Sequence, residues 1–406
     1  MVIVPWFLIT SIAAVMPVAA RPQLKFEPQE KITTGSLERL EVALEWQVRE
    51  FVPGPHPADP IKQIAVDGQQ GILYLHCQRW GYGLEKSKPA GIFAYNMHTG
   101  EQIRHIRVPA RLDMSGSSRN ASGRCIFDFE NRAAWYACGL EETNVVLRLD
   151  LEKDQPRVVA RDLVFADEPR TGDGRLLLVT PRRWRQAREV SWFDPATERL
   201  DNPVELPIDV EWTWIGAAGK HVVGLSQPYP EDNGGPDRRK PARWQVLKAD
   251  DQRIVSLASR LSDLDKVKPG PRGAADNFAL DSVDGRLLIL SAPFEHRDAV
   301  KRPLTVCEIP TLETICEGGA FFWTRFVPVA KTPCIMLLRG PSSPEVLFLA
   351  EKDCKVRRRL NFASTQVSQA GESWTPFSDA SGLFVGVYGA RGVVLFAVRP
   401  PGQEGQ

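Results

Sequence analysis

The chain lacks most of the short motifs that identify a cofactor or nucleotide site. It has no Cys-x-x-Cys pair, no Cys-x-x-Cys-His, no glycine-rich phosphate loop and no dinucleotide-binding fingerprint. These absences remove support for a structural zinc site, thioredoxin-like chemistry, covalently attached haem and nucleotide binding through such motifs. The six histidines show no metal-ligand spacing, and residues 223–227 lack the second glycine of a nucleophile elbow. A redox cofactor would therefore have to come with a partner chain.

The chain also lacks an excess of charge and a dividing linker. Its formal net charge is +1, which argues against nucleic acid as a partner because that partner attracts strongly basic surfaces. No low-complexity segment separates two halves of the 406 residues. Since this length exceeds the usual single-core domain, a repeated architecture is the simplest way to build one domain from it.

The first residues have the composition of an export signal. Residues 2–20 carry no charge, and Val18-Ala19-Ala20 places small residues ahead of Arg21. We therefore predict a signal peptide over residues 1–20 and a secreted or periplasmic/lumenal protein with no stable membrane span after cleavage. No Lys or Arg precedes the apolar stretch, which is close to the about 20 residues that span a bilayer. An uncleaved anchor is the alternative.

Seven cysteines agree with export. Their spacing around predicted hairpins suggests three bridges, since facing residues of antiparallel strands lie within disulfide range. The expected pairs are Cys125–Cys138, Cys307–Cys316 and Cys334–Cys354, which leaves Cys77 single. Asn120-Ala121-Ser122 is a candidate glycosylation site.

Repetition is the main structural signal. A strand, a short polar turn and a second strand recur along the chain, with an inner hairpin ahead of most copies. The strands before the polar turns are 92–95, 145–149, 190–193, 244–247, 304–308, 346–349 and 393–398; examples of the inner hairpins are 63–66 with 72–77, 125–129 with 134–138, and 278–281 with 287–290. This pattern predicts an all-β, seven-bladed β-propeller of four-stranded antiparallel blades.

The last repeat has no second strand after its polar turn, so another segment must supply the fourth strand. Residues 42–51 alternate like a strand and precede the first repeat. We expect an N-terminal extension over residues 21–41, a single propeller over 42–399 whose last blade is closed by 42–52, and a disordered tail over 400–406. Closure of this kind removes an open sheet edge.

The turns carry a resemblance to known propellers. The segments Phe193-Asp194-Pro195-Ala196-Thr197-Glu198-Arg199 and Tyr95-Asn96-Met97-His98-Thr99-Gly100-Glu101 resemble the strand-turn-strand signature of quinoprotein-like and lactonase-like propellers. The resemblance covers the repeated units and implies the architecture. Lactonase-like propellers use acidic and amide side chains around an axial metal to polarise an ester.

Loop length separates the two faces of such a ring. The first-to-second and third-to-fourth turns of a blade share one face and are short, whereas the loops of the other face are long, as at 78–90, 181–188, 227–242 and 292–302. Lys and Arg outnumber Asp and Glu in these long loops, with Arg182, Arg183 and Arg185 around one tryptophan. The long-loop face is therefore the expected functional face, and it should attract anions.

Tryptophan and threonine recur where blades begin. The candidate ligand-binding residues of these segments are Trp212, Trp214, Trp323, Thr324 and Trp374. They would wall a pocket at the mouth of a central channel. The alternative is that these indoles pack between blades.

Acidic and amide residues stand beside the same segments. Glu211, Asn277 and Glu372 offer oxygen ligands that suit an axial calcium ion, and no other cofactor is indicated. Glu211 and Glu372, with Arg325, are also candidate catalytic residues for acid–base chemistry. The alternative is that the carboxylates cap turns and pair with arginines.

Two functions follow from this pattern. In the first, the protein binds a small anionic or aromatic molecule at the mouth of the channel and transforms it as a hydrolase, isomerase or cyclase would. In the second, it is a non-catalytic platform whose Arg- and Trp-rich loops hold an acidic glycan or a partner protein. The sequence leaves open whether the protein is an enzyme.

Overall fold

The structure is a computed structural model in which the described residues form largely antiparallel β-sheets and no helix. The described residues are 27–33, 43–50, 61–77, 91–96, 101–108, 124–140, 143–153, 155–181, 187–228, 242–250, 253–261, 278–281, 285–290, 302–321, 324–329, 334–339, 345–361, 375–378, 384–388 and 392–399. Within them, no helix is long and apolar enough to cross a membrane.

Four sheets are antiparallel runs of four consecutive strands. Their strands are β3 (Ile61–Asp67), β4 (Ile72–Cys77), β5 (Gly91–Asn96) and β6 (Gln102–Arg107); β7 (Arg124–Asp128), β8 (Ala133–Leu140), β9 (Thr143–Asp150) and β10 (Arg157–Arg161); β20 (Phe278–Asp281), β21 (Arg286–Leu290), β22 (Arg302–Glu308) and β23 (Thr314–Phe321); and β24 (Thr324–Pro328), β25 (Cys334–Arg339), β26 (Glu345–Ala350) and β27 (Val356–Asn361). Each of them is the strand–turn–strand unit that the sequence repeats.

A nine-stranded sheet consists of two such runs joined at one point. The first contains β11 (Val164–Arg170), β12 (Leu176–Pro181), β13 (Ala187–Asp194), β14 (Arg199–Leu200) and β15 (Val204–Glu205); the second contains β16 (Val210–Ala218), β17 (His221–Pro228), β18 (Arg243–Asp250) and β19 (Arg253–Leu261). A single parallel pairing, Glu168 with Gly216, connects β11 to β16. Pro203 separates β14 from β15, because proline has no N–H for the sheet.

The last sheet joins the two ends of the chain. It contains β28 (Thr375–Ser378), β29 (Phe384–Tyr388), β30 (Gly392–Arg399), β2 (Ala43–Glu50) and β1 (Glu27–Thr33). β2 pairs antiparallel with the whole of β30, from Ala43 opposite Arg399 to Glu50 opposite Gly392. The strand predicted over residues 42–51 is thus present and pairs with the last strand. β1 adds a fifth strand that the sequence did not indicate, because its residues have little apolar alternation.

Hydrophobic cores lie between neighbouring sheets. In β8, Ala134, Tyr136 and Cys138 pack toward the β3–β6 sheet, whereas Ala133, Trp135 and Ala137 pack toward the β11–β15 strands. Alternate side chains of a strand point to opposite faces, so a strand buried on both faces needs apolar residues at nearly every position. This explains the continuous apolar runs of the inner hairpins.

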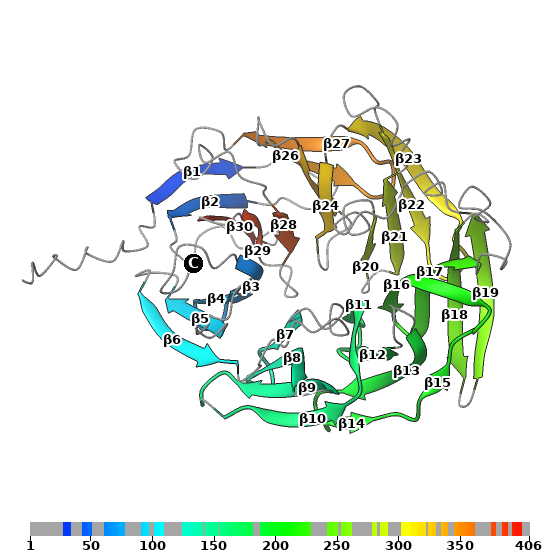
Figure 1. Ribbon diagram of the computed structural model, residues 1–406. Coiled ribbons are helices and arrows are strands. Elements are labelled where there is room, and N and C mark those ends of the chain that lie inside the picture. The colour runs from blue at the N-terminus through cyan, green and yellow to red at the C-terminus, as the bar shows by residue number, and fades with distance from the viewer. Residues whose placement is uncertain are drawn as a thin grey trace, which may run out of the picture.

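The sheets are arranged around the middle of the molecule (Figure 1), with the first strand of each run toward the middle and the last strand toward the rim. Inner strands of successive sheets contact each other, as β16 does with β20 and β20 with β24. The predicted strands before the polar turns are all present, as β5, β9, β13, β18, β22, β26 and β30.

Candidate functional site

The short turns form a layer on one face. In the β7–β10 sheet, the backbone N–H of Leu151, after β9, donates to the carbonyl oxygen of Arg132, between β7 and β8, over 3.0 Å. In the β20–β23 sheet, Ile309 N–H donates to Gly285 O over 2.7 Å in the same way. The prediction that first-to-second and third-to-fourth turns share a face is confirmed for these sheets.

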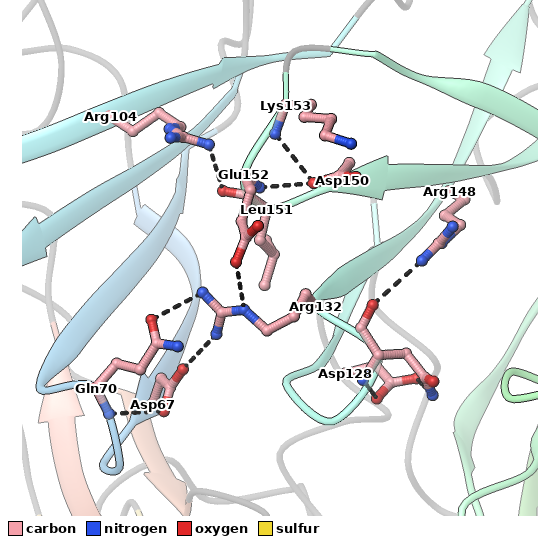
Figure 2. Close-up of polar contacts among 11 residues, drawn as sticks. Asp67, Gln70, Arg104, Asp128, Arg132, Arg148, Asp150, Leu151, Glu152 and Lys153 are labelled. Carbon is pink, nitrogen blue, oxygen red and sulfur yellow. Dashed lines mark hydrogen bonds and ion pairs between the residues drawn. The ribbon is translucent and has the colours of Figure 1, made fainter.

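Arg132 ties this layer together across two sheets (Figure 2). Its guanidinium donates to Asp67 over 2.8 Å and to Gln70 over 2.8 Å, both near the β3–β4 turn, and to Glu152 over 3.1 Å in its own sheet. Asp67 is 4% exposed. A buried carboxylate needs a partner, so Arg132 is a structural ion-pair residue.

Other arginines connect neighbouring sheets in the same manner. Arg157 of β10 pairs with Glu198 beyond β13, and Arg286 of β21 pairs with the buried Glu351 beyond β26. Arg260 of β19 donates to the hydroxyl of Thr314 in β23 over 2.8 Å. These three arginines therefore connect one sheet to the next, a role that a count of net charge does not reveal.

Trp212 and Trp214 lie in two different cores, so the expectation that these indoles wall the mouth is corrected to the packing alternative. Trp212 pairs with Ser226 and Trp214 with the adjacent Leu225, which makes Thr213 the extra residue of a β-bulge. A bulge reverses which face later residues occupy. Trp212 consequently packs toward β12 and β13, and Trp214 toward the β20–β23 sheet.

Contacts of the two indoles are those of core residues. Trp212 is 3% exposed, and its Nε1–H donates to Pro207 O over 3.1 Å. Trp214 is 6% exposed, with ring centroids 5.8 Å from Trp244 and 5.0 Å from Phe278 in edge-on geometry. The free energy of their burial stabilises the fold.

Carboxylates near the middle of the molecule were missed by sequence reasoning. In β11, Phe165 pairs with Leu178 but Arg170 pairs with Leu176, so residues 166–169 bulge away from β12. Asp167 and Glu168 in this bulge are exposed. Asp167 accepts the N–H of Ile215 in β16 over 2.9 Å. The sequence signal that could have indicated this bulge is the run Asp167-Glu168-Pro169, two acids and a proline, within the β11 segment.

Gly216 permits the approach of β11 to β16. A Cβ at this position would lie 3.1 Å from the Cβ of Glu168, 2.7 Å from Trp214 and 2.9 Å from Leu280. A residue with a side chain would therefore displace the bulge or the indole. The close approach places the Glu168 backbone beside β16.

Glu211 and Thr213 stand near the start of β16. Glu211 is half-buried and Thr213 is exposed, and the Thr213 hydroxyl donates to Leu225 O over 3.0 Å. β16 begins opposite the end of β17, where Glu211 faces Gln227, whereas Glu168 faces Gly216 near the other end of β16. The described site is this acidic wall of β11 and β16.

The remaining predicted site residues lie outside what the structure describes. These are Arg182, Arg183, Arg185, Trp323, Trp374, Glu372, Asn277 and Asn120. Thr324 and Arg325 begin β24, opposite Arg339 and Leu338, but their side chains are not described. Among the residues with described side chains, no three His, Cys, Asp or Glu are grouped to hold a metal ion.

The predicted disulfide pairing is wrong. Cys316 of β23 is bonded to Cys354 beyond β26, with Cα atoms 6.0 Å apart. Cys125, Cys138, Cys307 and Cys334 are buried free thiols. Burial raises the pKa of Cys138 to about 12, so this thiol stays neutral.

The strand registers explain the error. Cys125 faces Tyr136 rather than Cys138, and Cys307 faces Thr314 because a bulge shifts β22 against β23. Cys334 faces Ala350. Symmetry about a turn predicts facing partners only where the register is regular, and the bond that forms joins two sheets instead. The structure does not describe the side chain of Cys77.

Comparison with known proteins shows a shared fold. No family model matches the sequence, and no curated protein matches it. The structure is similar to an oligogalacturonate lyase in complex with manganese, with a TM-score of 0.54 and 11% identity over 93% of this chain and 97% of that one. It is also similar to the β-propeller domain of the Trilobed protease from Pyrococcus furiosus, with a TM-score of 0.50 and 11% identity over 84% of this chain and 95% of that one. Such low identity shows the architecture without the activity: the protein is an all-β protein of β-propeller architecture.

Proposed function

We propose that the protein is an exported seven-bladed β-propeller, spanning residues 42–399 and closed by β2, that binds a small anionic molecule at the mouth of its central channel. The pairing of β2 with β30 supports closure. The disulfide between Cys316 and Cys354 supports an oxidising compartment, in line with a signal peptide over residues 1–20.

The observation that carries the proposal is the bulge of β11. Bulges are found next to active sites, where they redirect side chains, and this one presents the exposed Asp167 and Glu168 beside β16. Glu211 extends the same wall toward the long loops. Carboxylates here accept hydrogen bonds from hydroxyl groups of a ligand.

The carboxylates of β11 and β16 and the arginines of the 181–188 loop together favour one class of ligand. Arg182, Arg183 and Arg185 supply cations in the loop over residues 181–188, which suits a carboxylate or sulfate. A ligand that carries both hydroxyls and a carboxylate, such as an acidic sugar, satisfies both parts. The name of oligogalacturonate lyase, which has a similar fold, records an acidic sugar.

Acid–base chemistry on the bound molecule is the second half of the proposal. One of Glu211 and Glu372 would accept a proton from the bound molecule and the other would donate one to it. Arg325 would stabilise the negative charge that develops on the molecule. In the alternative arrangement, Glu211, Asn277 and Glu372 would instead hold an axial calcium ion that orients the ligand. Elemental analysis of purified protein, before and after a chelator, tests that ion directly.

Titration with trigalacturonate tests the binding. We expect saturable quenching of tryptophan fluorescence, and about tenfold weaker binding when Glu168→Gln removes one carboxylate. Glu205→Gln is the matched control, because Glu205 is exposed on the outer strand β15. Equal affinity in Glu168→Gln and the wild type would contradict the proposal.

The same titration distinguishes channel binding from the alternative function, a non-catalytic interaction platform. If Arg182, Arg183 and Arg185 changed together to Ser abolish a salt-sensitive binding that Glu168→Gln leaves intact, the loops alone bind the partner. That result would support the non-catalytic alternative and exclude the channel.

A further inference from the structure

A cavity of about 460 Å³ opens on the short-turn face, between the β3–β6 and β7–β10 sheets. It lies away from the β11–β16 wall and is independent of the function proposed above. Its volume is in the range of small-molecule sites, about 300–1,000 Å³. The lining residues come from β4, β5, β6 and the β3–β4 turn of one sheet and from the turns of the other: Gln70, Ile72, Tyr74, Ala94, Ile103, Arg104, Arg132, Leu151, Glu152 and Lys153.

The floor of the cavity is apolar. Tyr74, Ala94 and Leu151 are buried there, and Tyr74 is held in place by Phe127 and Phe129, with ring centroids 5.5 Å away in each case. Ile103 of β6 exposes 50% of its surface at the rim. When a ligand covers exposed apolar surface beside a concave site, that surface leaves water and the complex is stabilised.

Cations line the rim. Arg104 reaches across from β6 and donates from Nη1 to Leu151 O over 3.0 Å (Figure 2). Among the residues that the structure describes, no carboxylate lies within ion-pair distance of Arg104 or Lys153. Arg132, by contrast, faces the two carboxylates of Asp67 and Glu152, so these three groups together with Arg104 and Lys153 carry a net charge of +1. The rim therefore keeps positive charge that its own sheet contacts do not compensate.

Tyr74 adds a neutral hydrogen-bond donor. Burial raises the pKa of its phenol, while Arg132 acts in the opposite direction. A protonated phenol beside a guanidinium can donate a hydrogen bond to an anion, and it carries no negative charge that would repel the anion.

From this arrangement we infer that the cavity binds a small amphipathic anion, a carboxylate or sulfonate on a flat apolar body. The body lies on Tyr74, Ala94 and Ile103, and the anionic group pairs with Arg104 and Lys153 at the rim. Neutral molecules of the same shape lack the ion pair and bind more weakly.

Fluorescence of anilinonaphthalene sulfonate, displaced by phenylacetate, tests the site. We expect phenylacetate to displace the dye about tenfold better than phenylacetamide does, and about tenfold better from the wild type than from Arg104→Gln. Glutamine keeps a donor for Leu151 O while it removes the charge. Arg107→Gln, on the same strand outside the cavity, should behave as the wild type.

Three outcomes would overturn the inference. They are the absence of dye binding to the wild type, equal displacement by the amide and the carboxylate, and unchanged phenylacetate affinity in Arg104→Gln with circular dichroism confirming its fold. Ile103→Ser gives a second readout, since loss of the apolar contact should weaken dye binding several-fold.

Discussion

Trp212 and Gly224 form a pair that depends on the absence of one side chain. The indole of Trp212 lies across Gly224 of β17, where a Cβ would come within 2.5 Å of the ring. Gly224 faces Ile215 of β16, two residues past the bulged Thr213. The glycine therefore makes room for the ring that closes this core.

We predict that Gly224→Ala displaces Trp212 and lowers the free energy of unfolding by about 1–3 kcal/mol, as overpacking does. Near-UV circular dichroism should change with it, because the indole loses its fixed surroundings. Gly174→Ala is the control, since that position has φ +85° and open space around it, so only backbone strain is added. An unchanged near-UV spectrum in Gly224→Ala would contradict this packing.

His221 gives the molecule a pH response at the residue scale. Burial lowers its pKa, the hydrogen bond with the Ala218 backbone acts in the opposite direction, and Lys248, its cross-strand neighbour, lowers the pKa further. The unfolded chain then binds a proton at higher pH than the folded one does. As pH falls below the ordinary histidine value of about 6.5, this residue lowers stability until the folded form is protonated as well.

Urea unfolding of the wild type and His221→Asn at pH 7.5 and pH 5 measures this contribution. We expect the wild type to lose more stability between the two pH values than the variant, because asparagine does not titrate. Equal losses in both proteins would show that His221 does not contribute.

The Cys316–Cys354 disulfide acts at the scale of elements, because it joins an outer strand to a turn of the next sheet. Gly318, two residues along β23, lies close enough that a Cβ would come 2.6 Å from the Cys354 Cβ. The sulfur of Cys316 lies 2.9 Å from Glu351 O. The bond thus reinforces a junction that the ion pair of Arg286 and Glu351 also holds.

We expect the double variant Cys316→Ser, Cys354→Ser to lose about 2–4 kcal/mol of stability, as natural disulfides contribute. A reductant should lower the melting temperature of the wild type and leave that of the double variant unchanged. Alkylation and mass spectrometry should find Cys316 and Cys354 protected and Cys125, Cys138, Cys307 and Cys334 alkylated after unfolding. Protection of Cys125 with Cys138 instead would restore the hairpin pairing.

Closure through the N-terminal strand is the prediction for the whole molecule. β30 pairs with β2 along its length, so removal of residues 1–52 leaves this edge of β30 without a partner strand. An exposed edge strand pairs with other chains. We expect aggregation in light scattering, with a lower melting temperature.

Removal of residues 1–26 is the matched control, since it keeps both β1 and β2. That protein should remain monodisperse with the melting temperature of the full chain. A monodisperse protein of unchanged stability after the longer deletion would contradict closure by β2.

Strands and hairpins could be predicted from the sequence because their signals are local. Apolar alternation and turn residues placed β5, β9 and β30 in the right segments, and Phe278–Asp281 was predicted to the residue. The partner of β30 was also predictable, since residues 42–51 were the one alternating segment left to complete the last repeat. For the site, local signals indicated only the entry of β16.

Register and inter-sheet packing were decided by the tertiary structure alone. One bulged residue, Thr213, sends Trp212 and Trp214 into different cores, and another bulge turns Cys307 away from Cys316. The sequence by itself determined an all-β chain of repeated hairpins, because burial of alternate side chains needs only short-range order. Which cysteines bond, which indoles are buried and which carboxylates lie in a bulge depend on contacts between residues far apart in the chain, where a shift of one position reverses a strand's two faces.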